Sequence, residues 1–150
     1  MHKLLSTVFV ACVGAVASET LAHAGLLSAT GMVIAILADD LFVGEAEGHL
    51  NGAGTLAIHS QRRPDLTCQG QFTSSAVLGG SGQMLCSDGA TATFRFQRLS
   101  VLRGHGTGSF SRGGMSFTYG LGAEEAARYL TLPEGKKLTY NGTELKLADL

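Results

Sequence analysis

The sequence contains no tryptophan, and aromatic residues make up only 7% of its 150 residues. Its 11 lysines and arginines nearly balance its 12 aspartates and glutamates, so the formal net charge is −1. A chain with few stacking side chains and no excess of positive charge lacks the usual surface for nucleic acids, anionic membranes or carbohydrates. Nucleic acid is therefore not a predicted partner.

Familiar catalytic and metal-binding signatures are also missing. No Gly-x-Ser-x-Gly motif occurs, and no Cys-x-x-Cys or His-x-x-x-His pair provides the ligand spacing of a zinc site. The glycine-rich segment 104–108 looks like a phosphate loop, but a Gly-Gly turn follows it instead of the helix that binds phosphate. The sequence therefore predicts no cofactor and no catalytic residue of a familiar type.

The first 24 residues have the organisation of a signal peptide. A basic start is followed by the apolar or small residues 4–17, and Ala22-His23-Ala24 has the small-x-small form of a cleavage site. The apolar run is too short for a membrane-spanning helix. We expect cleavage after Ala24, with Ala17 as the second choice. Residues 25–150 then form a single domain that is periplasmic or secreted and not an integral membrane protein.

Cys12 supports an alternative, in which it is the lipid-modified cysteine of an envelope lipoprotein. The apolar run before Cys12 is very short, and Phe9 stands where a leucine-like residue is usual. The sequence favours export without a lipid anchor, and anchoring through Cys12 stays the alternative.

Short alternating runs separated by glycine turns fill most of residues 25–150. Three units of the form Gly-x-Gly-polar-apolar begin at Gly52, Gly80 and Gly106, and each leads into a strand-like run, a turn and a return run. Repeats at this spacing indicate stacked hairpins, and Asp88-Gly89 is a typical hairpin turn. The predicted fold is all-β: an antiparallel meander that closes into a small barrel or a sandwich.

Three other segments complete this prediction. The continuous apolar run 31–37 indicates a strand that is buried on both faces, with a short core helix as the alternative. Residues 122–130 have the one good helix signal, with acidic residues in the first turn. Asn141-Gly142 predicts a last hairpin at the C-terminus.

Cys68 and Cys86 remain after cleavage, and both fall on the face of their runs that carries the core residues. An even pair in an exported chain is most simply a disulfide, which would contribute about 3 kcal/mol by closing its loop. The alternative is two buried free thiols.

The pattern Cys68-x-Gly-x-Phe72, Cys86-Ser-Asp-Gly and Phe94-x-Phe96, together with the Gly-x-Gly units, resembles a loose class of small exported bacterial β-proteins. The resemblance covers about residues 41–121. Its motifs consist of turn and core residues, so it implies an exported β fold and no active site.

Glu45, Glu47 and His49 form the best polar constellation. On a strand these side chains point the same way, and two carboxylates with an imidazole can bind a divalent metal or act as acid and base. The simpler interpretation is a solvated strand face. Because turn and core residues explain nearly every other distinctive position, we expect a non-enzymatic envelope protein that binds a protein partner, inhibits an enzyme such as a cell-wall hydrolase, or supports an assembly. The alternative is a metal-dependent or hydrolytic enzyme that uses these three residues.

Overall fold

The structure, a computed structural model, describes residues 28–75 and 77–150. The expected signal peptide, residues 1–24, and the lipoprotein alternative at Cys12 lie outside the described residues. Within them, no helix has both the length and the apolar character needed to cross a bilayer.

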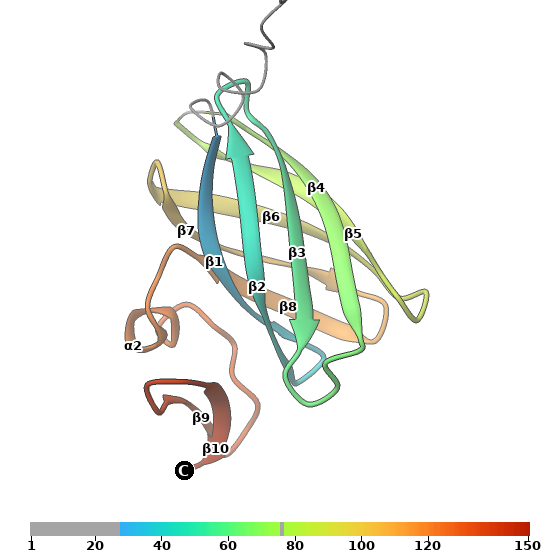
Figure 1. Cartoon of the computed structure of the whole chain (residues 1–150), viewed down its shortest axis with the longest axis vertical. Helices are drawn as coiled ribbons and strands as arrows, with labels where there is room; N and C mark the ends of the chain where they lie inside the picture. Colours follow the sequence, from blue (N-terminus) through green and yellow to red (C-terminus); the bar gives the residue numbers. More distant parts are fainter. Residues whose placement is uncertain (1–27, 76) are drawn as a thin grey trace, which may run out of the picture.

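Eight strands of the described chain form a closed antiparallel barrel in which each strand pairs with the next and the last returns to the first (Figure 1). The strands are β1 (Ser28–Leu37), β2 (Asp40–His49), β3 (Ala53–Ser60), β4 (Thr67–Ser75), β5 (Gly79–Cys86), β6 (Thr91–Ser100), β7 (Arg103–Phe110) and β8 (Gly113–Tyr119). The prediction of an all-β meander is confirmed. Of the two predicted architectures, the chain forms the barrel.

Alternation along the strands separates the inside of the barrel from the outside. Ala92, Phe94 and Phe96 of β6 are buried in the core, whereas Thr93 and Arg95 between them are exposed. Burying an aliphatic or aromatic side chain in this way contributes about 1.5–3 kcal/mol. Period-2 alternation therefore favours a strand, and burial of the apolar side chains on its inner face contributes most of the free energy that stabilises it.

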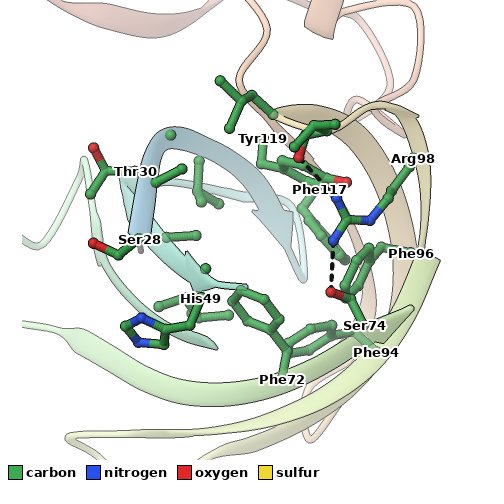
Figure 2. Close-up of a pocket in the computed structure, with 18 of the residues that line it drawn as sticks. Ser28, Thr30, His49, Phe72, Ser74, Phe94, Phe96, Arg98, Phe117 and Tyr119 are labelled. Carbon is green, nitrogen blue, oxygen red and sulfur yellow. Dashed lines mark hydrogen bonds between the residues drawn. The ribbon is translucent and has the colours of Figure 1, made fainter. Parts of the chain in front are cut away.

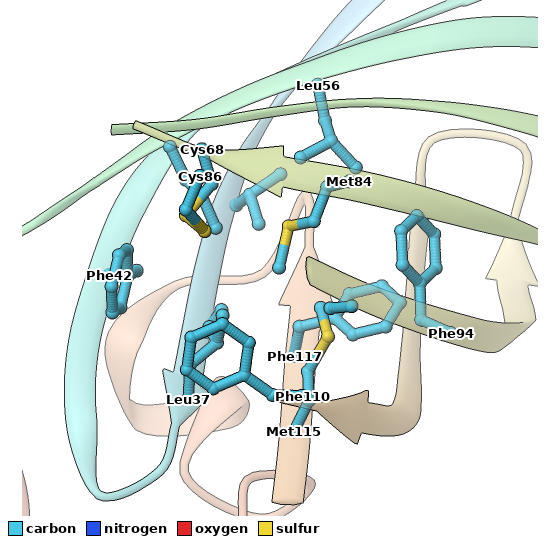
Figure 3. Close-up of a cluster of buried hydrophobic side chains, with 14 of the residues drawn as sticks. Leu37, Phe42, Leu56, Cys68, Met84, Cys86, Phe94, Phe110, Met115 and Phe117 are labelled. Carbon is cyan, nitrogen blue, oxygen red and sulfur yellow. A yellow bond between two sulfur atoms is a disulfide. The ribbon is translucent and has the colours of Figure 1, made fainter. Parts of the chain in front are cut away.

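One end of the barrel is filled with side chains, and we call this end the floor (Figure 3). It lies where β1 turns into β2, β3 into β4, β5 into β6 and β7 into β8. The floor consists of Leu37, Phe42, Leu66, Cys68, Cys86, Ala90 and Phe110, all of which are buried.

The floor also contains the predicted cysteine pair. Cys68 of β4 lies directly opposite Cys86 of β5 in the strand register, and their sulfur atoms are 1.99 Å apart, the distance of a disulfide. Both side chains point into the barrel, as their place among core residues predicted.

The C-terminal segment packs against the outside of the barrel rather than joining it. It contains α2 (Ala123–Ala126) and the hairpin of β9 (Lys136–Tyr140) and β10 (Leu145–Asp149), which form a separate two-stranded sheet. Together with β1 and β2 it encloses a second buried cluster: Ile34, Ile36, Leu41, Leu121, Ala126, Leu130 and Leu145. This cover explains why residues 33–37 form a strand buried on both faces, whereas Met32, earlier in the predicted run 31–37, is 46% exposed.

The helix at 122–130 is shorter than the sequence predicts. Ala127 donates its backbone N–H to Ala123, four residues back, but Tyr129 donates to Ala126, only three back. The chain tightens at this point and places Leu130 in the outer cluster, where it is buried. Packing against β1 therefore outweighs the local preference for helix beyond Ala126.

Candidate functional site

The barrel end opposite the floor encloses a cavity of about 330 Å³ (Figure 2). We call this end the mouth; the turns β2–β3, β4–β5 and β6–β7 surround it. The cavity is lined largely by apolar and aromatic side chains: Val33, Ala46, Leu56, Ile58, Phe72, Phe94, Phe96, Met115 and Phe117. Eight strands give a barrel just wide enough to be filled by its own side chains or to hold one small ligand. This barrel is filled by its own side chains at the floor and encloses a cavity at the mouth.

Aromatic rings form much of the cavity wall. Phe96 packs edge to face against Phe72 and Tyr119, with ring centroids 5.6 and 5.7 Å apart, and Phe94 packs similarly against Phe117 at 5.3 Å. Such edge-to-face pairs are favourable beyond the area that they bury. The rings therefore support one another and keep the cavity open.

Arg98, the next inward position of β6 after Phe96, extends its guanidinium into the mouth between Ser74 and Tyr119 (Figure 2). Its Nη2 donates to Oγ of Ser74 at 2.7 Å, and its Nη1 donates to the carbonyl oxygen of Val101 at 2.9 Å. Oγ of Ser74 in turn donates to the carbonyl of Gly52 at 3.3 Å. These bonds connect three hairpins and hold the arginine in position.

The charge of Arg98 has no anionic partner among the described residues. None of the five ion pairs found there involves it, and no aspartate or glutamate lines the cavity. Within the same described ranges, Nε of Arg98 is buried without a hydrogen-bond acceptor. A half-buried cation with free donors therefore faces an apolar cavity.

The hydroxyl of Tyr119 is buried beside Arg98 and also lacks a partner in the described part of the chain. Burial raises the pKa of Tyr119 above its ordinary value of 10.0, because the phenolate would lose hydration, and the nearby charge of Arg98 opposes this only in part. At neutral pH the hydroxyl is therefore protonated and is a hydrogen-bond donor.

Exposed apolar side chains surround the mouth on its three hairpin turns. Three of these side chains are mostly open to solvent: Leu50 is 81% exposed, and Val77 and Leu78 are each 82% exposed. The remaining members of this rim are Leu99, Val101 and Leu102. Leu50, Val101 and Leu102 also line the cavity, so apolar surface continues from the rim into the barrel.

Glu45, Glu47 and His49 do not form a common site. The two glutamates border a depression on the outer face of β2–β6, whereas His49 lines the mouth of the inner cavity (Figure 2). Glu45 and His49 are exposed, and among residues 28–75 and 77–150 no three His, Cys, Asp or Glu side chains lie close enough to hold a metal ion. Glu45 and Glu47 share the outer face of β2, but the structure does not bring the three residues together around a reacting centre.

Arg98 is the residue that the sequence interpretation missed. The period-2 alternation that places Ala92, Phe94 and Phe96 on the inner face of β6 also places Arg98 there. An arginine at the end of an apolar series was the available signal, because a charged residue facing into a barrel needs a partner.

Comparison with known protein families, curated proteins and solved structures finds no match to this chain. The cavity and its lining residues are therefore the features from which a function can be inferred.

Proposed function

We propose that this protein is an exported, non-enzymatic binding protein that holds a small, mainly apolar ligand in the mouth of its barrel. The observation that carries the proposal is the 330 Å³ cavity, which is bounded by aromatic and aliphatic side chains and rimmed by exposed apolar turns. Small-molecule sites are typically concave, mostly apolar and provided with a few polar groups that fix orientation. The mouth has each of these properties.

The volume limits the size of the ligand. At about 30 Å³ for each water molecule, the cavity corresponds to roughly eleven waters. A ligand with about ten non-hydrogen atoms in the cavity therefore fits, whereas a larger one would project through the mouth between the apolar turns.

Export and the envelope location support a binding role and are part of the proposal. They rest on the signal-peptide organisation of residues 1–24 and on the cysteine pair, which suits an oxidising compartment. A protein partner, such as the hydrolase expected from the sequence, is a second use to which the exposed rim is suited, because large exposed apolar patches mark interaction sites. The enzyme alternative gains no support from the separate positions of Glu45, Glu47 and His49.

The experiment is a calorimetric titration of the purified protein with 1-octanol, a neutral ligand of suitable size, and with the apolar fluorophore N-phenyl-1-naphthylamine. A blocking variant is Gly48→Leu. A Cβ at Gly48 would meet only the ring of Phe72, at 3.9 Å, which is an ordinary contact, so the added side chain can fill the mouth without displacing backbone. The matched control is Gly114→Leu, at an exposed position with nothing within 4 Å of an added Cβ.

We expect saturable binding of one octanol per protein, loss of that binding in Gly48→Leu with unchanged or higher thermal stability, and normal binding in Gly114→Leu. Octanol binding that Gly48→Leu leaves intact would place the ligand elsewhere. Absence of binding to the unaltered protein would contradict the proposed function.

A further inference from the structure

The ligand-binding end of the barrel carries one fixed positive charge. Of the side chains that line the cavity in the described part of the chain, Arg98 alone is always charged, and His49 at the mouth is the other ionisable base. An arginine is costly to bury without a counter-charge, because its water is removed and not replaced. Its position in the mouth therefore calls for a specific compensating group.

The hydrogen-bonding capacity of this corner is only partly used. A guanidinium has five N–H donors. Two of them bond Ser74 and Val101, and Nε has no acceptor in the described ranges. The hydroxyl of Tyr119 is likewise without a partner there. Arg98 and Tyr119 thus carry unused donors, and the cavity lining contains no acceptor of opposite charge.

We propose that the ligand is an amphiphile with a single carboxylate, whose head group binds Arg98 and Tyr119 while its acyl chain extends toward Phe94, Met115 and Phe117. This inference rests on the proposed function, since it assigns the chemistry of a ligand in the same cavity. Such a ligand supplies the group that the mouth lacks, an anion with two oxygen acceptors. Its apolar body matches the rest of the cavity wall.

The register of the strands supports this orientation. Arg98, Gly104 and Tyr119 lie side by side on β6, β7 and β8, one level nearer the mouth than Phe96, Gly106 and Phe117. The next level down holds Phe94, Gly108 and Met115. The polar corner is thus at the opening and the wall below it is apolar, so a head group reaches the donors only if the chain points toward the floor.

The charge of the head group decides affinity and selectivity. Planar carboxylates accept two parallel N–H bonds from a guanidinium, and charge-assisted bonds of this kind are about twice as strong as neutral ones. A neutral hydroxyl has less acceptor capacity and leaves donors unpaired, and an ammonium head is repelled by Arg98.

The test is a set of calorimetric titrations with octanoate, 1-octanol, octyl sulfate and octylamine, which share one chain and differ in the head group. Octanoate has about ten non-hydrogen atoms, which suits the cavity volume. Each ligand is titrated into the unaltered protein, Arg98→Gln, Arg98→Lys and Tyr119→Phe. Arg95→Gln is the matched control, because Arg95 lies on the same strand but is exposed on its outer face.

We expect octanoate to bind most tightly and octylamine most weakly. Arg98→Gln should weaken octanoate about tenfold to a hundredfold while octanol changes by less than about threefold, and Tyr119→Phe should weaken octanoate about threefold to tenfold. Arg98→Lys should recover part of the octanoate affinity, and Arg95→Gln should change nothing. Retained octanol binding also shows that a variant is folded.

Three results would overturn the inference. If Arg98→Gln leaves the ratio of octanoate to octanol affinity unchanged, Arg98 does not bind a carboxylate head group. The apolar cavity and the proposed function are not affected by that result. Tighter binding of octyl sulfate than of octanoate would show that the site prefers a tetrahedral head group to the planar carboxylate. If neither octanol nor octanoate binds the unaltered protein, this inference and the proposed function fail together.

Discussion

The ring of Phe117 occupies the space that a side chain on Gly106 of the neighbouring strand would need. A Cβ at Gly106 would lie 2.5 Å from Cζ of Phe117 and 2.2 Å from the carbonyl oxygen of Arg95. The glycine therefore lets the ring lie flat against β7 and leaves the centre of the barrel free. This relationship gives the first prediction.

Gly106→Ala is expected to destabilise the protein by about 1–3 kcal/mol, because the backbone of β6 and the ring of Phe117 have to move to admit one methyl group. Displacement of the ring toward the barrel axis should also reduce binding of 1-octanol. Thermal unfolding and calorimetry measure the two effects. In the control Gly114→Ala, where an added Cβ has open space, stability should stay the same or rise slightly. Equal stability of the two variants would contradict the proposed packing.

The cysteine pair gives a prediction for the floor. The double variant Cys68→Ala/Cys86→Ala should lose about 3 kcal/mol of stability, since the bond closes a loop with a sequence separation of 18. Mass spectrometry of the native protein after alkylation should find no modified cysteine at these positions before reduction and two after it. Because neither cysteine lines the cavity, the folded double variant should still bind 1-octanol. Two alkylated thiols in unreduced protein would refute the bond.

A pH-dependent prediction concerns Asp88 in the β5–β6 turn. Its Oδ1 accepts the backbone N–H of Ala90 at 3.0 Å, and its Oδ2 lies 2.6 Å from Nη1 of Arg112 in the β7–β8 turn. These bonds, the backbone one first, lower the pKa of Asp88 below its ordinary value of 3.8. A lowered pKa stabilises the folded state above the unfolded value, and this contribution is lost as the pH falls through the folded value.

Asp88→Asn should therefore lower the melting temperature at pH 7, and the difference from the unaltered protein should shrink as the pH falls below 3.8. Thermal unfolding followed from pH 7 to pH 2 measures this difference. The control is Asp65→Asn, an exposed acid in the loop between β3 and β4. A difference for Asp88→Asn that stays constant over the whole range would show that ionisation of Asp88 does not stabilise the turns.

The C-terminal hairpin gives a prediction for the outer cluster. Leu145 at the start of β10 is buried against β1 and β2, and Leu145→Ala should cost about 2–5 kcal/mol. Leu150→Ala, at a position that is 84% exposed, should change stability by less than about 0.5 kcal/mol. Chemical denaturation of both variants measures the difference. If Leu145→Ala were as mild as the control, the hairpin would not contribute to the stability of the barrel.

The part of the fold that depends on period-2 alternation could be predicted from the sequence. The inward series of β6, the hairpin turn at Asp88-Gly89 and a strand at the apolar run 31–37 each follow from local pattern and are found in the structure, with burial on both faces over residues 33–37. The inward direction of Cys68 and Cys86 followed from the faces of their strands, whereas their register, directly opposite each other, comes from the structure.

The sequence left a barrel and a sandwich open, and the cavity could not be predicted from local pattern at all. Pairing of β1 with β8 joins segments far apart in sequence, and only this closure creates an inside in which Arg98 and Tyr119 meet. The sequence interpretation instead selected Glu45, Glu47 and His49, because spacing along one strand is visible without the fold. The end of the helix at Ala126 was missed for a related reason, since it depends on the contact of Leu130 with β1.

Two kinds of barrel glycine have different consequences for the proposed ligand. At Gly106 and Gly54 an aromatic ring fills the place of the missing side chain, whereas Gly31 and Gly48 line the cavity and an added Cβ there makes only ordinary contacts. If the mouth binds a ligand as proposed, a side chain at Gly31 or Gly48 would reduce the space for that ligand without displacing the aromatic rings of the wall. Substitutions at these two positions would then change the accepted ligand size separately from the stability of the barrel.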